Sequence, residues 1–432
     1  METKLARIRE ISEQRPDEVF TSICHFLSEE MLQQCHHELD GKKAVGIDRV
    51  TKDEYARNLE ENIKNVVERL KKKAFRPQAV RRAYIPKGNG KVRMLGIPAY
   101  EDKIVQMGLN KVMQAIYEPI FLELSYGFRP GRSCHDALKA LNRIIEKGRT
   151  NYVVEVDIRG FFDHVNHEWL MKFIDHKISD PSIKRLIVRF LKAGVLEEGK
   201  FMTTDEGTPQ GAIISPTLAN IYLHYVLDIW FEKVISKNCR GQAEMIRYAD
   251  DFICCFQHKE DAKKFLESLK ERLAKFNLEI AEEKTKTLMF GRYATEMCRE
   301  RGIRRPETFD FLGFTHFCGK NRNGKFRIKR KTSDRKFKEK VKTFKEWMAK
   351  VRHLPAEDMM KTVRAKLRGH YQYYGITDNR EMLRKFRSCV VMTMYKWLNR
   401  RSQRKSFTWD KFQLFLKKYK LPYPRIYVNI YG

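Results

Sequence analysis

Several features that would assign a chain to a class are missing from these 432 residues. No apolar run approaches the ~20 residues that span a bilayer, and the N-terminus Met1-Glu2-Thr3-Lys4 lacks the apolar core of a signal peptide. The nine cysteines never occur as Cys-x-x-Cys and the twelve histidines are scattered, which argues against zinc and against a disulfide framework. We therefore expect a globular protein of the reducing cytoplasm, with buried free thiols such as Cys254 and Cys255.

Acidic residues are scarce toward the C-terminus. Residues 319–432 contain 33 Lys and Arg but only 8 Asp and Glu, so +25 of the formal net charge of +31 lies in about a quarter of the chain. Charge concentrated in this way favours a dedicated nucleic-acid-binding module whose affinity falls steeply with salt. A membrane surface or another acidic partner is the alternative. The clearest boundary in composition lies near residue 319, and 42% hydrophobic residues suffice for a sizeable core.

The most informative motif is Tyr248-Ala249-Asp250-Asp251, which has apolar residues on both sides. This pattern predicts a strand, a tight turn and a second strand. Because adjacent carboxylates repel each other, the turn either is simply solvated or holds a cation such as Mg²⁺ at its two acids.

A third carboxylate lies at the end of another predicted strand. Residues 151–158 are rich in β-branched side chains and favour a buried strand that carries Asp157 near its end. Asp157 could instead cap the helix expected to begin near Phe161. As a set, Asp157, Asp250 and Asp251 would hold two ions that clamp the attacking and leaving oxygens of a phosphoryl transfer.

Three further patterns each allow a functional and a structural interpretation. Lys87 and Arg93 lie on a predicted glycine-centred hairpin, which either brings two cations onto a triphosphate or is a solvated basic hairpin. Gln210 lies in a proline-containing turn before a helix whose apolar residues within 218–229 are expected on one face. It is either an amide that contacts a nucleotide or part of a plain loop-to-helix junction. Phe162 is either a core residue or the wall of a sugar pocket that excludes a 2′-hydroxyl.

The motifs occur in a fixed order: the basic hairpin, Tyr126-Gly127-Phe128-Arg129-Pro130, Asp157 followed by Phe161-Phe162, Thr208-Pro209-Gln210-Gly211, Tyr248-Ala249-Asp250-Asp251 and Phe311-Leu312-Gly313-Phe314. In this order they resemble the reverse transcriptases encoded by bacterial group II introns, from about Gly46 to the C-terminus. The resemblance implies an α+β right-hand polymerase. Residues 1–150 would form an N-terminal extension and fingers, 151–318 a palm with an antiparallel sheet on helices, and 319–432 a basic helical thumb.

The resemblance also implies roles for individual residues. Asp157 and Asp250 would be the main metal ligands, with Asp251 and Ile158 beside them, for two Mg²⁺ ions that Mn²⁺ can replace. The implied nucleotide-binding residues are Lys87, Arg93, Ile158, Phe162 and Gln210, with Lys87 and Arg93 on the triphosphate and Phe162 as the sugar gate.

One role in the family pattern fits two residues of this chain, and one residue departs from the pattern. In the family, a lysine of a Glu-Lys-Thr-Lys element protonates the pyrophosphate leaving group. Both Lys284 and Lys286 fit here, and we choose Lys284. Ala212 stands where a second glycine is expected, which slightly stiffens that loop.

The segment beyond residue 319 resembles the X or maturase domain of the same family. Its residues Phe337, Val341, Phe344, Met348 and Val351 repeat at 4-3-4-3 spacing, which predicts one apolar seam in a three-helix thumb. Cations interleaved with aromatics suit phosphate contact and base stacking on structured RNA, although some of the tyrosines must be core residues. The RNA-binding candidates are Arg364, Lys366, Arg368, His370, Tyr371, Arg400, Arg401, Arg404 and Lys405.

We therefore expect an RNA-directed DNA polymerase that also binds its group II intron RNA as a maturase in splicing and retrohoming. Its partners would be the intron RNA, an RNA template, a DNA primer and dNTPs, in the bacterial cytoplasm or at the nucleoid. No membrane partner is expected, and a homodimer is left open. Because the sequence ends soon after Tyr427, we expect no HNH endonuclease domain of its own. The alternatives are a domesticated or retron-like bacterial reverse transcriptase, and a splicing factor that only binds RNA.

Overall fold

The computed structural model describes residues 2–86, 92–197, 200–202, 206–208, 210–401 and 406–431. These residues form helices and three separate sheets, which confirms the predicted α+β class. Among them, no helix combines the length and the apolar character that a bilayer span requires. None of the nine cysteines, all of which lie among the described residues, forms a disulfide, and Cys254 and Cys255 are buried as expected.

The chain forms two compact units, each made of segments that are interleaved in the sequence. Unit 1 consists of Met1–Ser133, Glu155–Cys254 and Lys263–Lys286, and unit 2 of Cys134–Val154, Cys255–Ala262 and Thr287–Gly432. The three domains predicted from the sequence are instead contiguous segments. The two divisions differ because sheets pair strands that are distant in the sequence, so a compact unit need not be one continuous segment.

The N-terminal part of unit 1 is mainly helical. Its helices are α1 (Glu2–Gln14), the 3-10 turn η1 (Cys24–Phe26), α2 (Glu29–Glu38), α3 (Lys52–Ala56), α4 (Leu59–Lys71) and, after the first hairpin, α5 (Tyr100–Tyr117). Thr51 caps α3. Its hydroxyl accepts a hydrogen bond from the Glu54 amide at 3.2 Å, and the Glu54 carboxylate accepts one from the Thr51 amide at 2.8 Å. This capping box satisfies two amides that would otherwise lack partners at the helix start.

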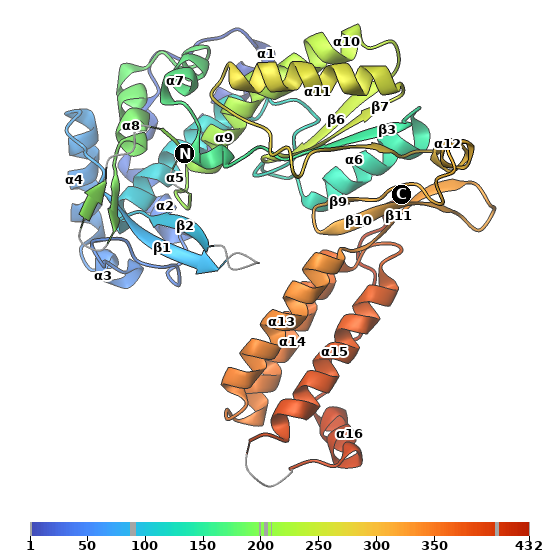
Figure 1. Cartoon of the computed structure of the whole chain (residues 1–432). Coiled ribbons are helices and arrows are strands. Elements are labelled where there is room, and N and C mark those ends of the chain that lie inside the picture. The colour runs from blue at the N-terminus through green and yellow to red at the C-terminus, as the bar shows by residue number, and fades with distance from the viewer. Residues whose placement is uncertain are drawn as a thin grey trace. The chain divides into compact units, whose positions relative to one another are not determined.

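The predicted basic hairpin forms the edge of the first sheet. The sheet has the order β2-β1-β4-β5, from β1 (Val80–Pro86), β2 (Val92–Ile97), β4 (Val195–Glu197) and β5 (Lys200–Met202). β1 and β2 are antiparallel, with Ile85 opposite Arg93, whereas β4 runs parallel to β1 (Figure 1). The hairpin tip, residues 87–91, lies outside the described residues.

A second four-stranded sheet has the order β6-β7-β3-β8. Its strands are β3 (Tyr152–Val156), β6 (Ala243–Tyr248), β7 (Asp251–Phe256) and β8 (Lys286–Met289). The helices around it in the sequence are η2 (Phe161–Asp163), α7 (His167–Asp175), α8 (Pro181–Leu191), α9 (Ser215–Leu223), η3 (His224–Asp228), η4 (Phe231–Ile235), α10 (Ser236–Asn238) and α11 (Lys259–Ala274). Strand β6, its turn and strand β7 confirm the strand-turn-strand prediction.

Two helix predictions are corrected. The helix expected from Phe161 is a single 3-10 turn, and α7 begins only at His167, after Asn166 accepts a hydrogen bond from the Trp169 amide at 3.0 Å. Helix α9, expected to be apolar on one face, is buried on every side, including its polar residue Asn220. It packs against both α5 and α7, so no face of it is left for solvent. The chain then continues through η3 and η4, which are π-helical.

Unit 2 contains a three-stranded antiparallel sheet and the predicted thumb helices. Its elements are α6 (Cys134–Lys147), α12 (Ala294–Glu300), β9 (Phe309–Phe311), β10 (Phe314–Lys320), β11 (Phe326–Thr332), α13 (Asp334–Val351), α14 (Ala356–Tyr374), α15 (Arg380–Leu398) and α16 (Trp409–Lys418). Helices α13, α14 and α15 lie side by side, which confirms the three-helix prediction (Figure 1). The apolar seam of α13 is confirmed as well, because Phe344 and Met348 are buried and Phe337 lies 6.3 Å from Phe386 of α15.

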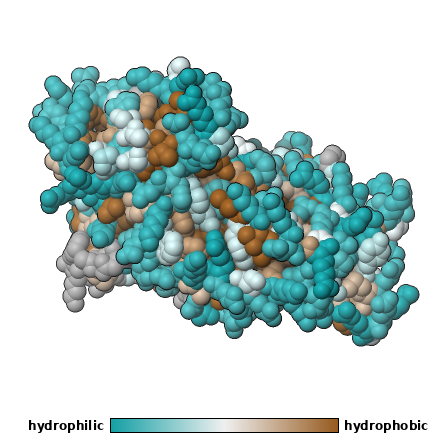
Figure 2. All heavy atoms as spheres, turned by 90° about the horizontal axis from the view of Figure 1, so that it is seen from above, coloured by the Kyte–Doolittle hydropathy of each residue, from teal (hydrophilic) through white to brown (hydrophobic). Residues whose placement is uncertain are grey.

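Hydrophilic side chains cover most of the face shown in Figure 2, where apolar side chains form only separate patches. The core of unit 1 lies instead along α5, where Ile104, Val112 and Ile116 have no exposed surface. Each fully buried aliphatic side chain stabilises the fold by about 1.5–3 kcal/mol before entropy costs.

Candidate active site

The predicted acidic turn joins two neighbouring strands of unit 1. Ala249 and Asp250 form the turn between β6 and β7, and Asp251 is the first residue of β7. Ala249 has a φ of 58°, in the left-handed region that residues with a side chain rarely adopt. Asp250 is half-buried and Asp251 is exposed. The turn therefore presents two carboxylates at one end of the sheet.

Asp157 lies at the same end of the sheet as this turn. Strands β3 and β7 are neighbours, and the Asn151 amide at the start of β3 donates to the Phe256 carbonyl at the end of β7 at 2.9 Å. The two strands therefore run in opposite directions, and the end of β3 lies beside the start of β7. Asp157 directly follows β3, so the strand pairing brings it to the edge that carries Asp250 and Asp251.

The main chain around Asp157 is fixed by the segment before β8. The Asp157 carbonyl accepts a hydrogen bond from the Ala281 amide at 2.7 Å, and Ile158 forms a bridge with Ile280. The Ile158 side chain is buried, so any contact of this residue with a metal or a nucleotide would use main-chain atoms. From the turn that follows Ala281, Lys284 Nζ contacts the Asp157 carboxylate. Lys286 is instead the first residue of β8.

The three acids were predicted to hold divalent ions. Among the described residues, no group of three or more His, Cys, Asp or Glu side chains forms a ready-made metal site. The Lys284 ammonium pairs with Asp157 and neutralises one of the expected ligands. The donor chemistry nevertheless fits a hard cation, because carboxylate oxygens are the preferred ligands of Mg²⁺. A metal ion at Asp157 would compete with Lys284 for this carboxylate.

The two predicted parts of the nucleotide pocket are joined by one main-chain and one side-chain hydrogen bond. The Thr208 amide donates to the Phe162 carbonyl at 2.7 Å, and Gln210 Nε2 donates to Asp163 Oδ1 at 3.2 Å. Gly207 makes this approach possible, because a Cβ there would lie 2.8 Å from the Asp163 carbonyl oxygen. Phe162 and Gln210, which are 48 positions apart, therefore lie in two segments that these hydrogen bonds hold together.

The basic hairpin is attached to the same element. The Gly96 amide of β2 donates to the Gln210 carbonyl at 2.7 Å, which ties the strand that carries Arg93 to the Gln210 turn. The Arg93 side chain is exposed. Lys87, the other predicted triphosphate contact, lies outside the described residues, as does Pro209 of the turn.

Polar residues of α5 that the sequence interpretation missed support this pocket. Gln106 Oε1 accepts a hydrogen bond from the Ile213 amide at 2.9 Å, next to the Gln210 turn. The Asp102 carboxylate accepts one from the Gln78 amide at 2.9 Å, and burial raises the pKa of Asp102 to about 7. Asp102 and Gln106 are one helical turn apart, on the face of α5 that also carries the buried Val105 and Leu109, and two polar residues on an apolar face were the signal that could have revealed them.

The predicted RNA-binding residues fall into exposed and buried groups. On α14, Lys366 and Arg368 are exposed, and Lys366 Nζ lies 4.9 Å from the centre of the Trp347 ring. Arg364 is half-buried, whereas Arg400 and Arg401 after α15 are exposed. Arg404 and Lys405 lie outside the described residues.

The structure contradicts two of these assignments. His370 is only 8% exposed and its ring stacks on Phe386 at 3.8 Å, and Tyr371 has no exposed surface. Both residues face the core between α14 and α15 because they continue the buried positions of Val363 and Leu367 along the helix. Neither side chain is therefore available to stack on an RNA base.

Two protein families match different parts of the chain. Residues 85–316, more than half of the chain, match the family described as reverse transcriptase (RNA-dependent DNA polymerase). Residues 335–415 match the group II intron, maturase-specific domain. The first match contains the predicted catalytic and nucleotide-binding residues, and the second contains α14, α15 and all but the first residue of α13.

Individual relatives agree with the family matches. The chain is 37% identical over 304 residues to the group II intron-encoded protein LtrA of Lactococcus lactis subsp. cremoris. The aligned segment covers 68% of this chain and 50% of that protein. It is 38% identical over 203 residues to protein YkfC of Escherichia coli (strain K12). This aligned segment covers 46% of this chain and 53% of that protein. The chain thus spans about half the length of these two relatives. It belongs to the reverse transcriptase family, and its polymerase segment continues into a group II intron maturase-specific domain.

Proposed function

We propose that the protein is an RNA-directed DNA polymerase that also binds group II intron RNA as a maturase and assists splicing and retrohoming. The observation that carries this proposal is the edge of the sheet at which Asp157 joins the Asp250-Asp251 turn. The three contiguous domains of the right-hand polymerase, 1–150, 151–318 and 319–432, are part of the same proposal. The intron RNA, an RNA template, a DNA primer and dNTPs are its proposed partners.

The proposed reaction joins the 3′-oxygen of the primer to the α-phosphorus of a dNTP and releases pyrophosphate. Reverse transcriptases use divalent metal ions, and two Mg²⁺ ions held by Asp157, Asp250 and Asp251 would offset charge on the attacking and leaving oxygens. The chain itself contributes positioning. Phe162 would wall the sugar side of the pocket, and Arg93 would bind the triphosphate, because its exposed guanidinium is tied through β2 to the Gln210 turn.

Primer extension tests the polymerase proposal directly. The full chain would be given an RNA template with an annealed DNA primer, the four dNTPs and Mg²⁺, and extended DNA would be measured. Absence of extension under these conditions and with Mn²⁺ would favour a splicing factor that only binds RNA. Splicing of a group II intron that surrounds the reading frame, at low Mg²⁺ with and without the protein, tests the maturase role.

Lys284, rather than Lys286, is proposed as the lysine that acts on the leaving group. It contacts Asp157, whereas Lys286 begins β8. Lys284→Ala is expected to lower kcat for dNTP addition by about 100-fold, the lower end of what positioned proton donors contribute. Lys286→Ala is the matched control, because it removes the same charge two residues away, and it should change kcat less than about threefold. Equal effects of the two variants in single-nucleotide extension would contradict the choice of Lys284.

The exposed cations of α14 are expected to contact RNA phosphates. Lys366→Ala and Arg368→Ala should each weaken intron RNA binding by several-fold and reduce the slope of log affinity against log salt by about one. His370→Ala is the contrasting variant, because it removes a buried ring and should lower Tm without changing the salt slope. Filter binding at several salt concentrations measures both quantities. An unchanged slope in the two cation variants would remove this face from the RNA interface.

A further inference from the structure

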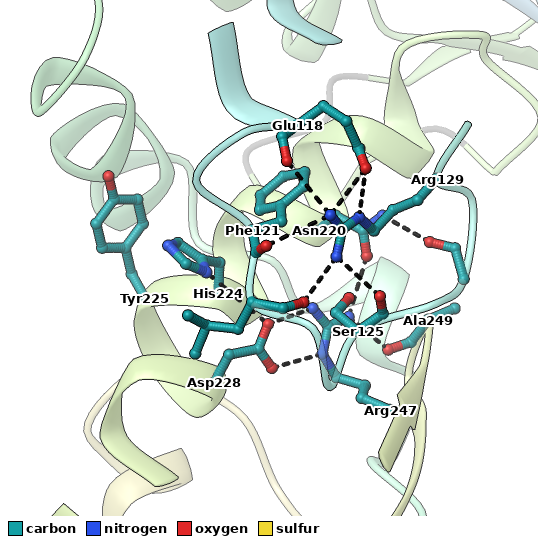
Figure 3. A network of polar contacts seen from close by, with 12 residues as sticks. Glu118, Phe121, Ser125, Arg129, Asn220, His224, Tyr225, Asp228, Arg247 and Ala249 are labelled. Atoms are coloured by element: carbon teal, nitrogen blue, oxygen red, sulfur yellow. Dashed lines mark hydrogen bonds and ion pairs between the residues drawn. The ribbon is translucent and has the colours of Figure 1, made fainter. Parts of the chain in front are cut away.

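A fully buried arginine of unit 1, Arg247, lies two residues before Ala249 of the acidic turn. Arg247 and Asp228 both have no exposed surface, and Arg247 Nε donates to Asp228 Oδ1 at 2.7 Å while Nη2 bonds to Oδ2 (Figure 3). Burial lowers the pKa of the adjacent His224 to about 4, so this ring is neutral at pH 7. Arg247 therefore supplies the charge that balances Asp228, which is the last residue of the π-helical segment η3.

The remaining donor of this guanidinium reaches the acidic turn itself. Arg247 Nη1 donates to the Ala249 carbonyl at 2.9 Å and to Asn220 Oδ1 at 3.0 Å (Figure 3). Ala249 is the turn residue with the left-handed φ, a conformation that persists only where the surroundings hold it. A single side chain thus bonds the strained turn to helix α9 and to η3.

The loop that contains Gly127 also contacts the turn. Asn220 Nδ2 donates to the Gly127 carbonyl at 2.8 Å, and a Cβ on Gly127 would lie 2.2 Å from the Ala249 nitrogen. The same loop pairs with β6, because the Tyr126 amide donates to the Arg247 carbonyl at 2.9 Å. The loop and the Arg247 side chain therefore both hold Ala249.

We propose that Arg247, with Asp228 and Asn220, is a positioning group for the proposed catalytic turn. It would act through the Ala249 carbonyl by holding the left-handed backbone that presents Asp250 and Asp251. This inference rests on the proposed polymerase function for its kinetic consequence. Its structural consequence, a tethered turn, is independent of that function. The competing explanation is that the buried ion pair only stabilises unit 1.

Arg247→Lys separates these explanations. Lysine keeps the positive charge beside Asp228, but its single ammonium cannot reproduce the planar fork that reaches Asp228, Asn220 and Ala249 together. We expect kcat for dNTP addition to fall by about 100-fold, the effect of a small misplacement of reacting groups. The dissociation constant for primer-template should stay within about threefold of wild type, because the thumb and the basic surfaces are unchanged.

Arg189→Lys is the matched control. Arg189 of α8 also lies in unit 1, and its Nη1 donates to the Lys73 carbonyl at 2.8 Å and to the Phe75 carbonyl at 2.5 Å, so these bonds tie α8 to the segment after α4 and not to the acidic turn or to the Gly127 loop. It should lower Tm by an amount similar to Arg247→Lys while keeping kcat within about threefold of wild type. A comparable loss of kcat in both variants would show general loosening and overturn the proposal.

A double substitution tests the role of the ion pair itself. Asp228→Leu with Arg247→Met removes both charges, and such neutral replacements of a buried pair often preserve stability. We expect near-normal Tm and a kcat that remains about 100-fold low, because the bond to the Ala249 carbonyl is still missing. Full activity in the folded double variant would show that the pair acts only on stability. If the double variant does not fold, Arg247→Lys and its control decide the question.

Hydrogen exchange provides a readout that does not depend on activity. In the protein without metal or nucleic acid, the peptide covering residues 245–253 should exchange faster in Arg247→Lys than in Arg189→Lys. Equal exchange in the two variants would overturn the tether even if wild type showed no primer extension. An inactive wild type with the expected exchange pattern would refute the polymerase proposal and leave the tether standing.

Discussion

Asp250→Ala is expected to abolish primer extension on an RNA template, and Asp157→Ala is expected to do the same. Both carboxylates lie at the sheet edge where β3 ends and β7 begins. Loss of either proposed ligand would leave charge on the reacting phosphate without its counter-charge. We expect kcat to fall by at least about 1000-fold, which corresponds to about 4 kcal/mol of lost transition-state stabilisation. Single-nucleotide extension in Mg²⁺ measures this change.

The control must show that the loss is chemical rather than structural. Both substitutions should leave Tm and intron RNA binding near wild type, because Asp250 is only half-buried and the basic thumb is untouched. Glu244→Gln is the matched acid, since Glu244 is half-buried at the far end of β6 and should be tolerated. Polymerase activity within about tenfold of wild type in Asp157→Ala or Asp250→Ala would contradict the assignment of the acids.

Features of the fold that depend on neighbouring residues in the sequence were predictable. The turn at Asp250 follows from apolar residues on each side of two short polar positions, and the cap of α3 follows from Thr51 and Glu54 at the required spacing. The seam of α13 follows from helical periodicity that ends in the buried Phe344 and Met348. In each case the pattern and the interaction lie within a few residues of one another.

The supports of the site could not be predicted in this way. Gly127 contacts Ala249 although 121 positions separate them, and neither residue carries a periodic signal for the other. In the sequence, nothing distinguishes Arg247 from any other cation on a strand. Its partners Asn220 and Asp228 belong to α9 and η3, which lie next to it only in the folded protein. Tertiary packing alone creates these contacts, so the sequence indicated the acids but not what holds them.

The misassignment of His370 and Tyr371 has a different cause. The composition of α14, with cations interleaved among aromatics, favoured an RNA surface over the whole segment. Helical periodicity places His370 three residues after Leu367, on the buried face, and Lys366 and Arg368 elsewhere. When composition and periodicity disagree within a helix, the periodicity decides which side chains reach solvent.

Replacing Phe162 is expected to weaken discrimination against ribonucleotides. The ring is half-buried beside Phe161, at 5.3 Å between ring centres, and its main chain is fixed by the Thr208 amide. Phe162→Val keeps that hydrogen bond, which uses the backbone, but removes the bulk that would meet a 2′-hydroxyl. The ratio of kcat/KM for dNTP over rNTP should fall by about 10- to 100-fold.

Two further variants separate a gate from a general change in the pocket. Phe162→Tyr keeps the bulk of the ring and should keep the discrimination ratio of wild type. Phe161→Leu alters a core ring that is only 2% exposed and lies 6.3 Å from Tyr222, so it should lower Tm without changing the ratio. If Phe162→Val polymerised dNTPs normally and still rejected rNTPs, sugar selection would have to come from the Gln210 turn or from the hairpin that carries Arg93. An altered ratio in Phe161→Leu alone would point instead to the core beneath η2.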